Sequence, residues 1–424
     1  MQQQPRFELL SAMAKNMPAL LADLEAIYKD LHANPELSMQ EVRTANIAAR
    51  YIEQLGYEVH ERVGVTGVVG LMKNGEGPTV MLRADMDALP MAEKTGLPYA
   101  SHKTGTTAEG ETVFVSHMCG HDLHVTWLMG AAKLLAEHRQ AWRGTLMLVF
   151  QPGEEVGKGA RAMVDDRMLE RFPKPDIILG QHVMVGEAGT VGYRSGTILS
   201  AGDSMSIRLY GKGAHGSMPQ NAIDPVVMAA ATVMRLQTIV SRELSPLENA
   251  VLTVGALQAG TKENIIPDDA VIKLNMRTYD EGVRQRMLDS VQRICCAECH
   301  ASNADQPPEF TTLSSYPLTQ NDVQATATLA DAFHGWFGER AYETAPASAS
   351  EDFSVFGREW GVPYVFWLVG CTEAQLWRKA VSSGDINQVP SNHSSRFAPQ
   401  LHPTLQTGLE TMVVGALAWL DVPV

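Results

Sequence analysis

The sequence has no apolar run near 20 residues and only 34 lysines and arginines against 48 aspartates and glutamates, a formal net charge of −14. A helix that crosses a membrane needs about 20 mainly apolar residues, so no membrane partner is predicted. Binding to phosphate groups needs a basic face, and the acidic balance therefore argues against a nucleic-acid partner.

Cysteine is scarce as well. Five cysteines in 424 residues, an odd number, favour a reducing compartment over a disulfide framework. Residues 1–16 contain no apolar core flanked by basic residues, so no secretion signal is predicted and the expected location is cytoplasmic. Cys295, Cys296, Cys299 and His300 resemble a zinc motif, but they fall in a helical pattern that runs from 282 to 301. This pattern favours buried helix cysteines over a second zinc site.

The length of 424 residues predicts two domains. Apolar strands alternate with helices through Val149, Ile178 and Val191, which predicts an α/β domain whose mainly parallel sheet has helices on both faces. From about residue 199 the order changes to strand, helix, strand, strand, helix and strand, a ferredoxin-like α+β arrangement. We therefore expect a first domain of residues 1–198 and 314–424, interrupted by a second of residues 199–313.

The individual elements follow from apolar periodicity and from glycine and proline signals. In the first domain we expect helices at 18–33, 40–55, 322–336 and 404–420, strands at 65–72, 79–84 and 362–369, and an irregular loop at 371–390. In the second we expect strands at 204–210, 250–258, 270–278 and 309–313 and helices at 226–240 and 282–301.

Residues 116–124, SHMCGHDLH, concentrate three histidines, a cysteine and an aspartate just before an apolar helical pattern. Thiolate and imidazole are preferred ligands of zinc and its neighbours, and Gly120 between Cys119 and His121 permits a tight turn that aims both at one point. A free buried cysteine beside solvated histidines is the alternative for this stretch alone.

Further potential ligands follow apolar strands. Glu154 and Glu155 come after the strand that ends at Gln151, and His182 ends the strand that begins near Pro175. Ends of sheet strands are where open α/β folds bind ligands, although adjacent glutamates are often only solvated surface. With His393, which lies in a polar loop, the candidate ligands are Cys119, His121, Glu155, His182 and His393. Five ligands exceed the needs of one tetrahedral ion, so we predict two metal ions that share a bridging ligand.

The same stretches resemble the co-catalytic dinuclear metallopeptidase family of aminoacylases, hippurate hydrolases, auxin-conjugate hydrolases and related carboxypeptidases. The matching segments are LHANPELS (31–38), LRADMDALP (82–90), HMCGH (117–121), QPGEE (151–155), GKGAHG (211–216), NIIP (264–267), SEDFS (350–354) and NHS (392–394). They spread over nearly the whole chain. The CGHD form is similar to the amidohydrolase branch, while Asn34 replaces a frequent histidine and the segment 104–115 is longer than usual.

The resemblance implies further roles. Asp87 would orient a ligand histidine, with Asp85 a weaker candidate for such a role. The inserted domain would serve as a lid and dimerisation domain, so a homodimer or higher homo-oligomer is expected. His215 would hydrogen-bond the developing oxyanion, often in the partner subunit's cleft, and Asn264 and Arg277 would bind the substrate.

The predicted reaction is hydrolysis of an N-acyl amino acid by a metal-activated water, with Glu154 as general base and acid and Cys119 as a bridging thiolate. Zinc is the favoured metal, and manganese, cobalt or nickel also suit these ligand types. Dipeptidase or carboxypeptidase action is the alternative within enzymes. A non-catalytic metal- or ligand-binding protein is the alternative outside them, and the presence of Glu154 argues against it.

Overall fold

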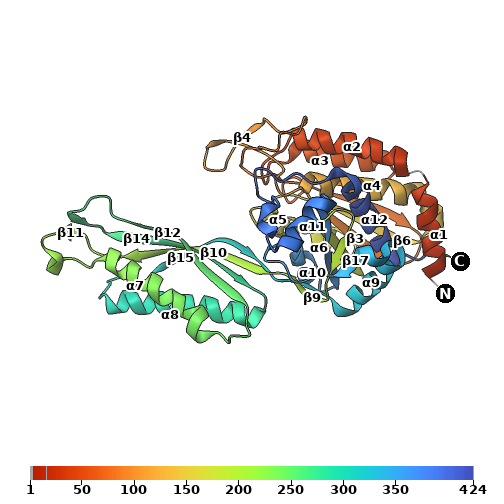
Figure 1. Cartoon of the computed structure of the whole chain (residues 1–424). Coiled ribbons are helices and arrows are strands. Elements are labelled where there is room, and N and C mark those ends of the chain that lie inside the picture. Colours follow the sequence, from red (N-terminus) through yellow and green to blue (C-terminus); the bar gives the residue numbers. More distant parts are fainter. Residues whose placement is uncertain (1–2, 16, 424) are drawn as a thin grey trace. The chain divides into compact units, whose positions relative to one another are not determined.

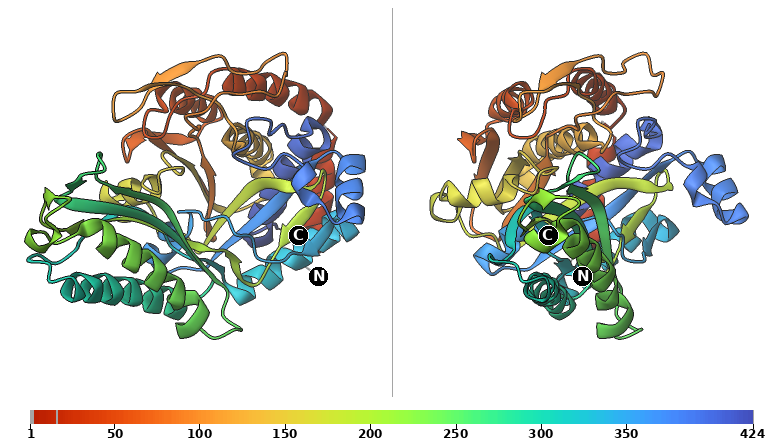
Figure 2. Two further views of the ribbon diagram at one scale, coloured as in Figure 1. Left: turned by 60° about the vertical axis from the view of Figure 1, so that its left-hand side comes forward. Right: turned by 90° about the vertical axis from the view of Figure 1, so that its left-hand side faces the viewer.

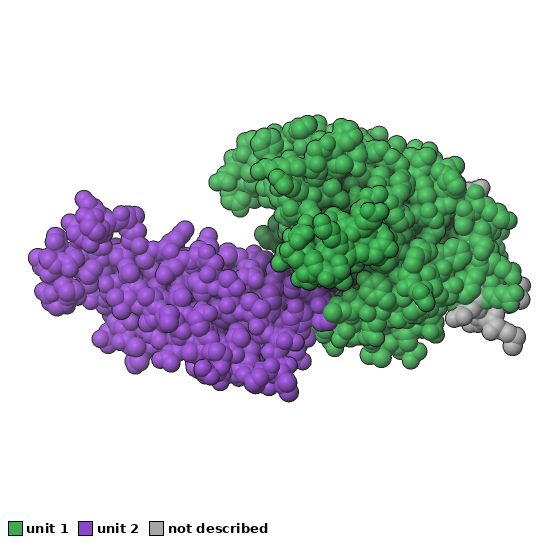
Figure 3. All heavy atoms as spheres, viewed as in Figure 1, with its two compact units in different colours: residues 1–198, 320–345, 352–424 green, residues 199–319, 346–351 purple. Residues whose placement is uncertain are grey.

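The computed structural model describes residues 3–15 and 17–423, and the chain divides into two compact units (Figure 1, Figure 3). Unit 1 comprises residues 1–198, 320–345 and 352–424, and unit 2 comprises residues 199–319 and 346–351. Met1, Gln2 and Asn16, which belong to the stretch considered for a secretion signal, and Val424 lie outside the described residues. Within the described part of the chain, no helix combines the length and apolar character needed to cross a bilayer.

Unit 1 is built on an eight-stranded sheet of order β1-β2-β6-β3-β7-β18-β8-β17. The strands are β1 (Glu58–Val63), β2 (Gly67–Asn74), β3 (Thr79–Asp85), β6 (Gly144–Gln151), β7 (Ile177–Glu187), β8 (Val191–Tyr193), β17 (Ala341–Glu343) and β18 (Tyr364–Thr372). The central strands β6, β3, β7 and β18 are parallel, while β1, β2 and β6 are joined by antiparallel pairings. The predicted mainly parallel sheet is confirmed.

Helices cover both faces of this sheet (Figure 2). On one face α4 (His121–Glu137) and α12 (Leu401–Trp419) pack on β3 and β7, with α2 (Met17–Ala33) and α9 (Val323–Phe337) beside them. Val80, Leu82 and Ala84 of β3 belong to the buried core on that face. Successive strand side chains alternate between faces, so Arg83 lies on the other side, against Phe353 at the start of α10 (Ser354–Trp360). There α10 packs on α5 (Gly159–Asp165).

Unit 2 has a four-stranded antiparallel sheet of order β12-β14-β10-β15. Its elements in chain order are β10 (Ala201–Tyr210), α7 (Pro225–Thr238), β12 (Ala250–Ala259), β14 (Asp269–Thr278), α8 (Glu281–Ala301) and β15 (Glu309–Tyr316). The two helices pack on each other and on the same sheet, and they share a core with it. The predicted ferredoxin-like arrangement is confirmed.

The main correction concerns residues 371–390, which were expected to be irregular. Cys371 and Thr372 end β18, and residues 374–383 form α11 (Ala374–Ser383). The caps explain this helix: Glu373 accepts hydrogen bonds from the amides of Gln375 and Leu376, and Gly384 ends it at a φ of 68°. Glutamate is not a favoured N-cap residue, so the usual start signal is missing. Helix α1 (Gln3–Ala14) and the hairpin of β4 (Thr104–Thr106) and β5 (Thr112–Phe114) were not predicted either.

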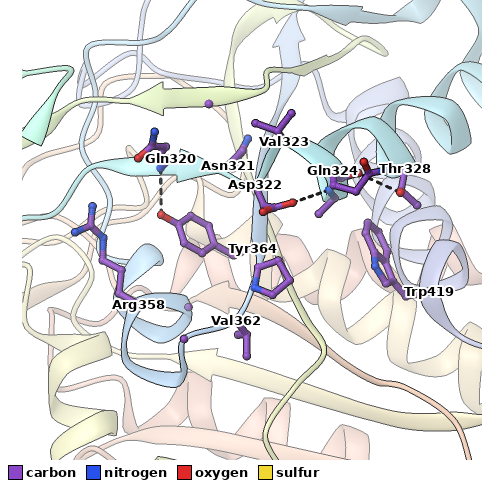
Figure 4. Close-up of a pocket in the computed structure, with 15 residues that line it drawn as sticks. Gln320, Asn321, Asp322, Val323, Gln324, Thr328, Arg358, Val362, Tyr364 and Trp419 are labelled. Carbon is purple, nitrogen blue, oxygen red and sulfur yellow. Dashed lines mark hydrogen bonds between the residues drawn. The ribbon is translucent and has the colours of Figure 1, made fainter.

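An open pocket of about 720 Å³ lies at the amino end of β18, one of the parallel strands (Figure 4). It is lined by the first turns of α9 and by the start of β18, and Tyr364 accepts a hydrogen bond there from the amide of Gln320. The ligand candidates of unit 1 lie at the opposite ends of these strands. This pocket is therefore separate from the candidate metal centre.

Candidate metal centre

The carboxyl ends of three neighbouring parallel strands carry the candidate metal-binding groups. Asp85 and Asp87 are at and just beyond the end of β3, Glu154 and Glu155 follow β6, and His182 lies in β7. Because β3 lies between β6 and β7, these side chains meet at one edge of the sheet. The edge is where α/β folds place ligands, as the sequence indicated.

Gly120 sets the positions of Cys119 and His121. Its φ of 85° is in the left-handed region that favours glycine, and a Cβ atom there would lie 2.4 Å from Val183. The turn lets α4 begin directly at His121. Cys119 and His121 are both buried, so their side chains face the interior of unit 1.

His393 reaches the same place from a distant loop. Its amide donates a hydrogen bond to the carbonyl of Met118 (2.8 Å), and Asn392 donates to the carbonyls of Cys119 and Val183 (3.0 Å each). His393 has a φ of 66°, which is unusual for a non-glycine residue and is frequently found at functional sites. These bonds tie the loop to the cysteine segment.

The side chains converge within a few ångströms. The distances are 3.4 Å from Cys119 Sγ to His182 Nε2, 3.8 Å from His121 Nε2 to Glu155 Oε1, 3.3 Å from His393 Nε2 to Glu155 Oε2 and 3.9 Å from His121 Nε2 to Glu154 Oε2. All five predicted ligands and Glu154 therefore lie together in unit 1, although they come from four separate segments.

Two of these atoms fit a metal ion in particular. His121 Nε2 and Glu155 Oε1 are buried and have no hydrogen-bond partner among the described residues, a costly arrangement unless another group binds them. Burial and the carboxylates of Glu155 and Glu154 raise the pKa of Cys119 well above its ordinary value. A thiolate is stable here only beside a compensating cation, and metal coordination deprotonates a thiol.

The second ring nitrogens of His121 and His182 have partners that orient the nitrogens expected to bind metal. His182 Nδ1 lies 2.7 Å from the carbonyl of Val183, and His121 Nδ1 lies 3.2 Å from Asp87 Oδ1. Asp87 also accepts hydrogen bonds from Ser38 (2.6 Å) and from the amide of Glu155 (3.0 Å). Burial works to raise the pKa of Asp87, but these hydrogen bonds outweigh it and the pKa is lowered. Asp87 thus connects the first residue of α4 to the loop that carries Glu154 and Glu155.

A buried polar network behind the ligands was largely missed from the sequence. His124 Nδ1 lies 2.5 Å from Asp85 Oδ1, and His124 Nε2 accepts a hydrogen bond from the amide of Val183, so neither nitrogen is left for a metal. Arg83 donates to Asp85 (2.8 Å) and contacts Asp352 (3.3 Å). Burial works to raise the pKa of Asp85, but His121, Arg83 and His124 hold the pKa well below its usual range. The spacing of three between His121 and His124 was the available signal, because it puts both on one face of α4.

The three remaining site candidates belong to unit 2. His215 is exposed in β11 (Ala214–His215), which pairs with β13 (Ile265–Ile266), and the amide of Gly216 donates to the carbonyl of Asn264 (2.8 Å). Arg277 lies in β14, where its Nε donates to Asn275 (3.2 Å) and its Nη1 donates to Ser350. His215 and Asn264 are therefore neighbours, and Arg277 is in a separate part of the unit.

The helical cysteines of unit 2 lie in α8, as predicted. Cys295 and Cys299 are buried as expected, but Cys296 is exposed, so the expected burial was wrong for that residue. Burial raises the pKa of Cys295 to about 12. Among the described residues, no group of three possible ligand atoms includes any of them.

Comparison with known proteins identifies the family of the chain. The model of the Peptidase family M20/M25/M40 matches residues 81–380. Hippurate hydrolase of Campylobacter jejuni is 39% identical over 80% of this chain and 85% of its own length, and N-acetyl-L-cysteine deacetylase of Bacillus subtilis is 36% identical over 82% of each. The crystal structure of the Bacillus subtilis YXEP protein, titled a dinuclear metal binding peptidase from the M20 family, matches with a TM-score of 0.75 at 27% identity, over 94% of this chain and 98% of that one. This chain belongs to the Peptidase family M20/M25/M40, and it is a metal-dependent amidohydrolase.

Proposed function

We propose that this amidohydrolase cleaves the amide bond of N-acyl amino acids, releasing a carboxylic acid and a free amino acid. The observation that carries the proposal is the convergence of five metal-binding side chains and Glu154 at one edge of the sheet. The names of two relatives, a hippurate hydrolase and an N-acetyl-L-cysteine deacetylase, support an acyl group on the nitrogen of an amino acid.

The ligands of the proposed centre are Cys119, His121, Glu155, His182 and His393, which would hold two divalent ions. The mixture of sulfur, nitrogen and oxygen donors suits zinc, with manganese, cobalt and nickel as alternatives. When bound, such ions lower the pKa of a water molecule and polarise the substrate carbonyl. The residues themselves contribute the fixed geometry, because the other nitrogens of His121 and His182 already have partners.

Glu154 is proposed as the group that moves protons. It is 5% exposed, and its Oε2 lies 3.9 Å from His121 Nε2, so it faces the centre while Glu155 provides the ligand oxygens. Asp87 fixes this pair by accepting the amide hydrogen of Glu155. A carboxylate in this position takes the proton of the attacking water and gives it to the departing amine.

Arg277 is proposed to bind the carboxylate of the amino-acid half of the substrate. Asn275 and Ser350 hold its Nε and Nη1, and Gly202 leaves room for the guanidinium, since a Cβ atom there would lie 2.7 Å from Nη1. A pre-oriented guanidinium is well suited to a carboxylate. Arg277→Lys should then raise KM for substrates with a free carboxylate far more than for their amides.

His215 and Asn264 are proposed to act in a homodimer. Arg277 pairs with Gly202 near the start of β10. His215 lies beyond Tyr210, which is at the other end of β10. At roughly 3.3 Å per residue, β14 extends about 26 Å between Asp269 and Arg277. One small substrate therefore cannot contact both Arg277 and His215 of the same chain. This supports delivery of His215 by a partner subunit.

The edge of the unit 2 sheet supports such a dimer. β12 is an edge strand of ten residues, and its side chains of Val251 and Leu257 are exposed. A long edge strand with exposed apolar side chains is a surface that natural proteins usually cover. We therefore propose that unit 2 pairs two copies of the chain, as a homodimer or a higher homo-oligomer. The cytoplasmic location stays a prediction.

A substrate panel tests the proposed function. The protein, loaded in turn with zinc, manganese, cobalt and nickel, is assayed with hippurate, N-acetyl amino acids, an indoleacetyl amino acid and dipeptides with free amino groups. The proposal expects the highest kcat/KM for an N-acyl amino acid. Higher values for dipeptides would show a peptidase instead, and no hydrolysis with any metal would leave the binding-protein alternative.

A further inference from the structure

His32, near the end of α2, is a fully buried histidine outside the proposed ligand set. It is 1% exposed, and both of its ring nitrogens face carboxylates. Nδ1 lies 2.6 Å from Asp122 Oδ2, and Nε2 lies 3.2 Å from Glu93 Oε1. The side chains of Asp122 and Glu93 are themselves 1% and 0% exposed.

This geometry favours a charged imidazole. A neutral histidine donates through one nitrogen and presents a lone pair at the other, which would face a carboxylate oxygen. With both nitrogens protonated, each contact becomes a charge-assisted hydrogen bond. Tyr28 and Tyr99 enclose the ring, with centroids 5.6 Å and 5.3 Å away, and keep the three charges out of water.

One contact leads to the start of α4. Asp122 directly follows His121, and its second oxygen accepts the amide hydrogen of Leu123 at 3.0 Å. The carbonyl of Asp122 accepts from Thr126 (2.6 Å). His32 therefore holds the first turn of the helix whose first residue is a proposed ligand.

The other contact leads to the loop of His393. Glu93 accepts hydrogen bonds from Thr95 and from the amide of Ser101 (2.7 Å), which fixes the loop of residues 93–101. The amide of the next residue, Lys94, donates to the carbonyl of Ser395 at 2.7 Å, two residues beyond His393. His32 and Glu93 thus support the position of the loop that carries a second proposed ligand.

We propose that His32 is a positioning residue of the metal centre: its imidazolium joins Asp122 beside His121 to Glu93 beside the His393 loop, and so keeps ligands from two distant segments at the spacing that two ions require. The inference rests on the proposed ligand set. Residues that orient metal ligands typically change metal affinity by about 10–100-fold when they are replaced.

The test is metal affinity at a temperature where the variant is folded by circular dichroism. His32→Gln should raise the dissociation constant of at least one zinc or cobalt ion by about tenfold or more, measured by chelator competition. His60→Gln is the matched control, because His60 also contacts a glutamate (Glu58, 3.0 Å) but lies in β1, away from the centre. Its dissociation constants should stay within about twofold of the wild-type values.

A folded His32→Gln protein with wild-type affinity for both ions would overturn the inference, even if its unfolding temperature were lower. If His32→Gln does not fold, Glu93→Gln is tested in its place, since this variant keeps the side-chain shape and removes one charge. An unchanged metal affinity of Glu93→Gln would again contradict the inference. Combined with His393→Ala, Glu93→Gln should cause little further loss, because the two act through one loop. A wild-type protein that binds fewer than two ions would reject the ligand set itself, and this inference with it.

Discussion

The charge of His32 makes the stability of the fold depend on pH in a defined direction. Burial works to lower the pKa of His32, but Asp122 and Glu93 outweigh it and raise the pKa to about 9 from an ordinary value of 6.5. A raised histidine pKa stabilises the folded state fully below pH 6.5, and the contribution is lost as the pH rises through 9. At roughly 1.4 kcal/mol per pKa unit, the loss amounts to about 3 kcal/mol.

The other titratable groups around His32 have pKa values outside the range from pH 7 to 10. Burial raises the pKa values of Tyr28 and Tyr99 above the ordinary tyrosine value near 10, and burial lowers the pKa of the nearby His117 to about 4. Burial works to raise the pKa of Asp122, but His117 and His32 outweigh it and lower the pKa. Lys29, which lies over the ring of Tyr99, has its pKa raised by its hydrogen bond to Glu25. Between pH 7 and 10, His32 is therefore the group of this cluster that changes charge.

The measurement is the free energy of unfolding in urea for wild-type protein and His32→Gln, both with a chelator present, at pH 7, 8, 9 and 10. The difference between the two proteins should shrink by about 3 kcal/mol from pH 7 to pH 10, at roughly 1.4 kcal/mol per unit below pH 9. The difference removes the contributions of groups common to both proteins. A difference that stays constant over the whole range would refute a buried imidazolium at this position.

Four further outcomes are expected. Glu154→Gln should retain both metals but lower kcat by roughly 10²–10⁴-fold, and near wild-type turnover would reject Glu154 as the proton carrier. Cys119→Ala should lose metal, measured by elemental analysis, and two full sites in that variant would contradict a shared thiolate. Mixing inactive Glu154→Gln with inactive His215→Ala protein should restore activity through hybrid dimers, whereas no recovery after proven subunit exchange would count against delivery across subunits. Gly408→Ala should destabilise unit 1 by about 1–3 kcal/mol, because a Cβ atom would lie 2.0 Å from Trp127, and an unchanged unfolding midpoint would show that the helix can shift.

Local chemistry made many elements predictable. The helices at 226–240 and 282–301 were expected within two residues of α7 and α8, and both begin after an aspartate whose side chain caps the helix. Such caps and the apolar periodicity act within a few residues, so they can be recognised in a sequence. Helix α11 was missed because its cap is Glu373, a residue that rarely marks a helix start.

The residue types of the metal ligands could also be predicted from the sequence, but the groups that orient these ligands could not. Cys119 and His121 stand two residues apart around a glycine, a pattern with a local meaning. Arg83 and Asp352 are 269 residues apart, and His124 meets Asp85 only because α4 packs against β3. Nothing in the spacing of such residues predicts their contact, since it depends on strand order and helix packing.

The sequence by itself determined the fold class, the family and the residue types available for metal chemistry, because motifs and periodicities are local properties of a chain. Only the tertiary structure decided which of these side chains meet. It brought Glu155 and His393 within 3.3 Å, left His121 Nε2 buried without a hydrogen-bond partner among the described residues, and placed His32 between two carboxylates. These contacts depend on the register of parallel strands and on burial, which fix distances and dielectric surroundings that no stretch of sequence specifies alone.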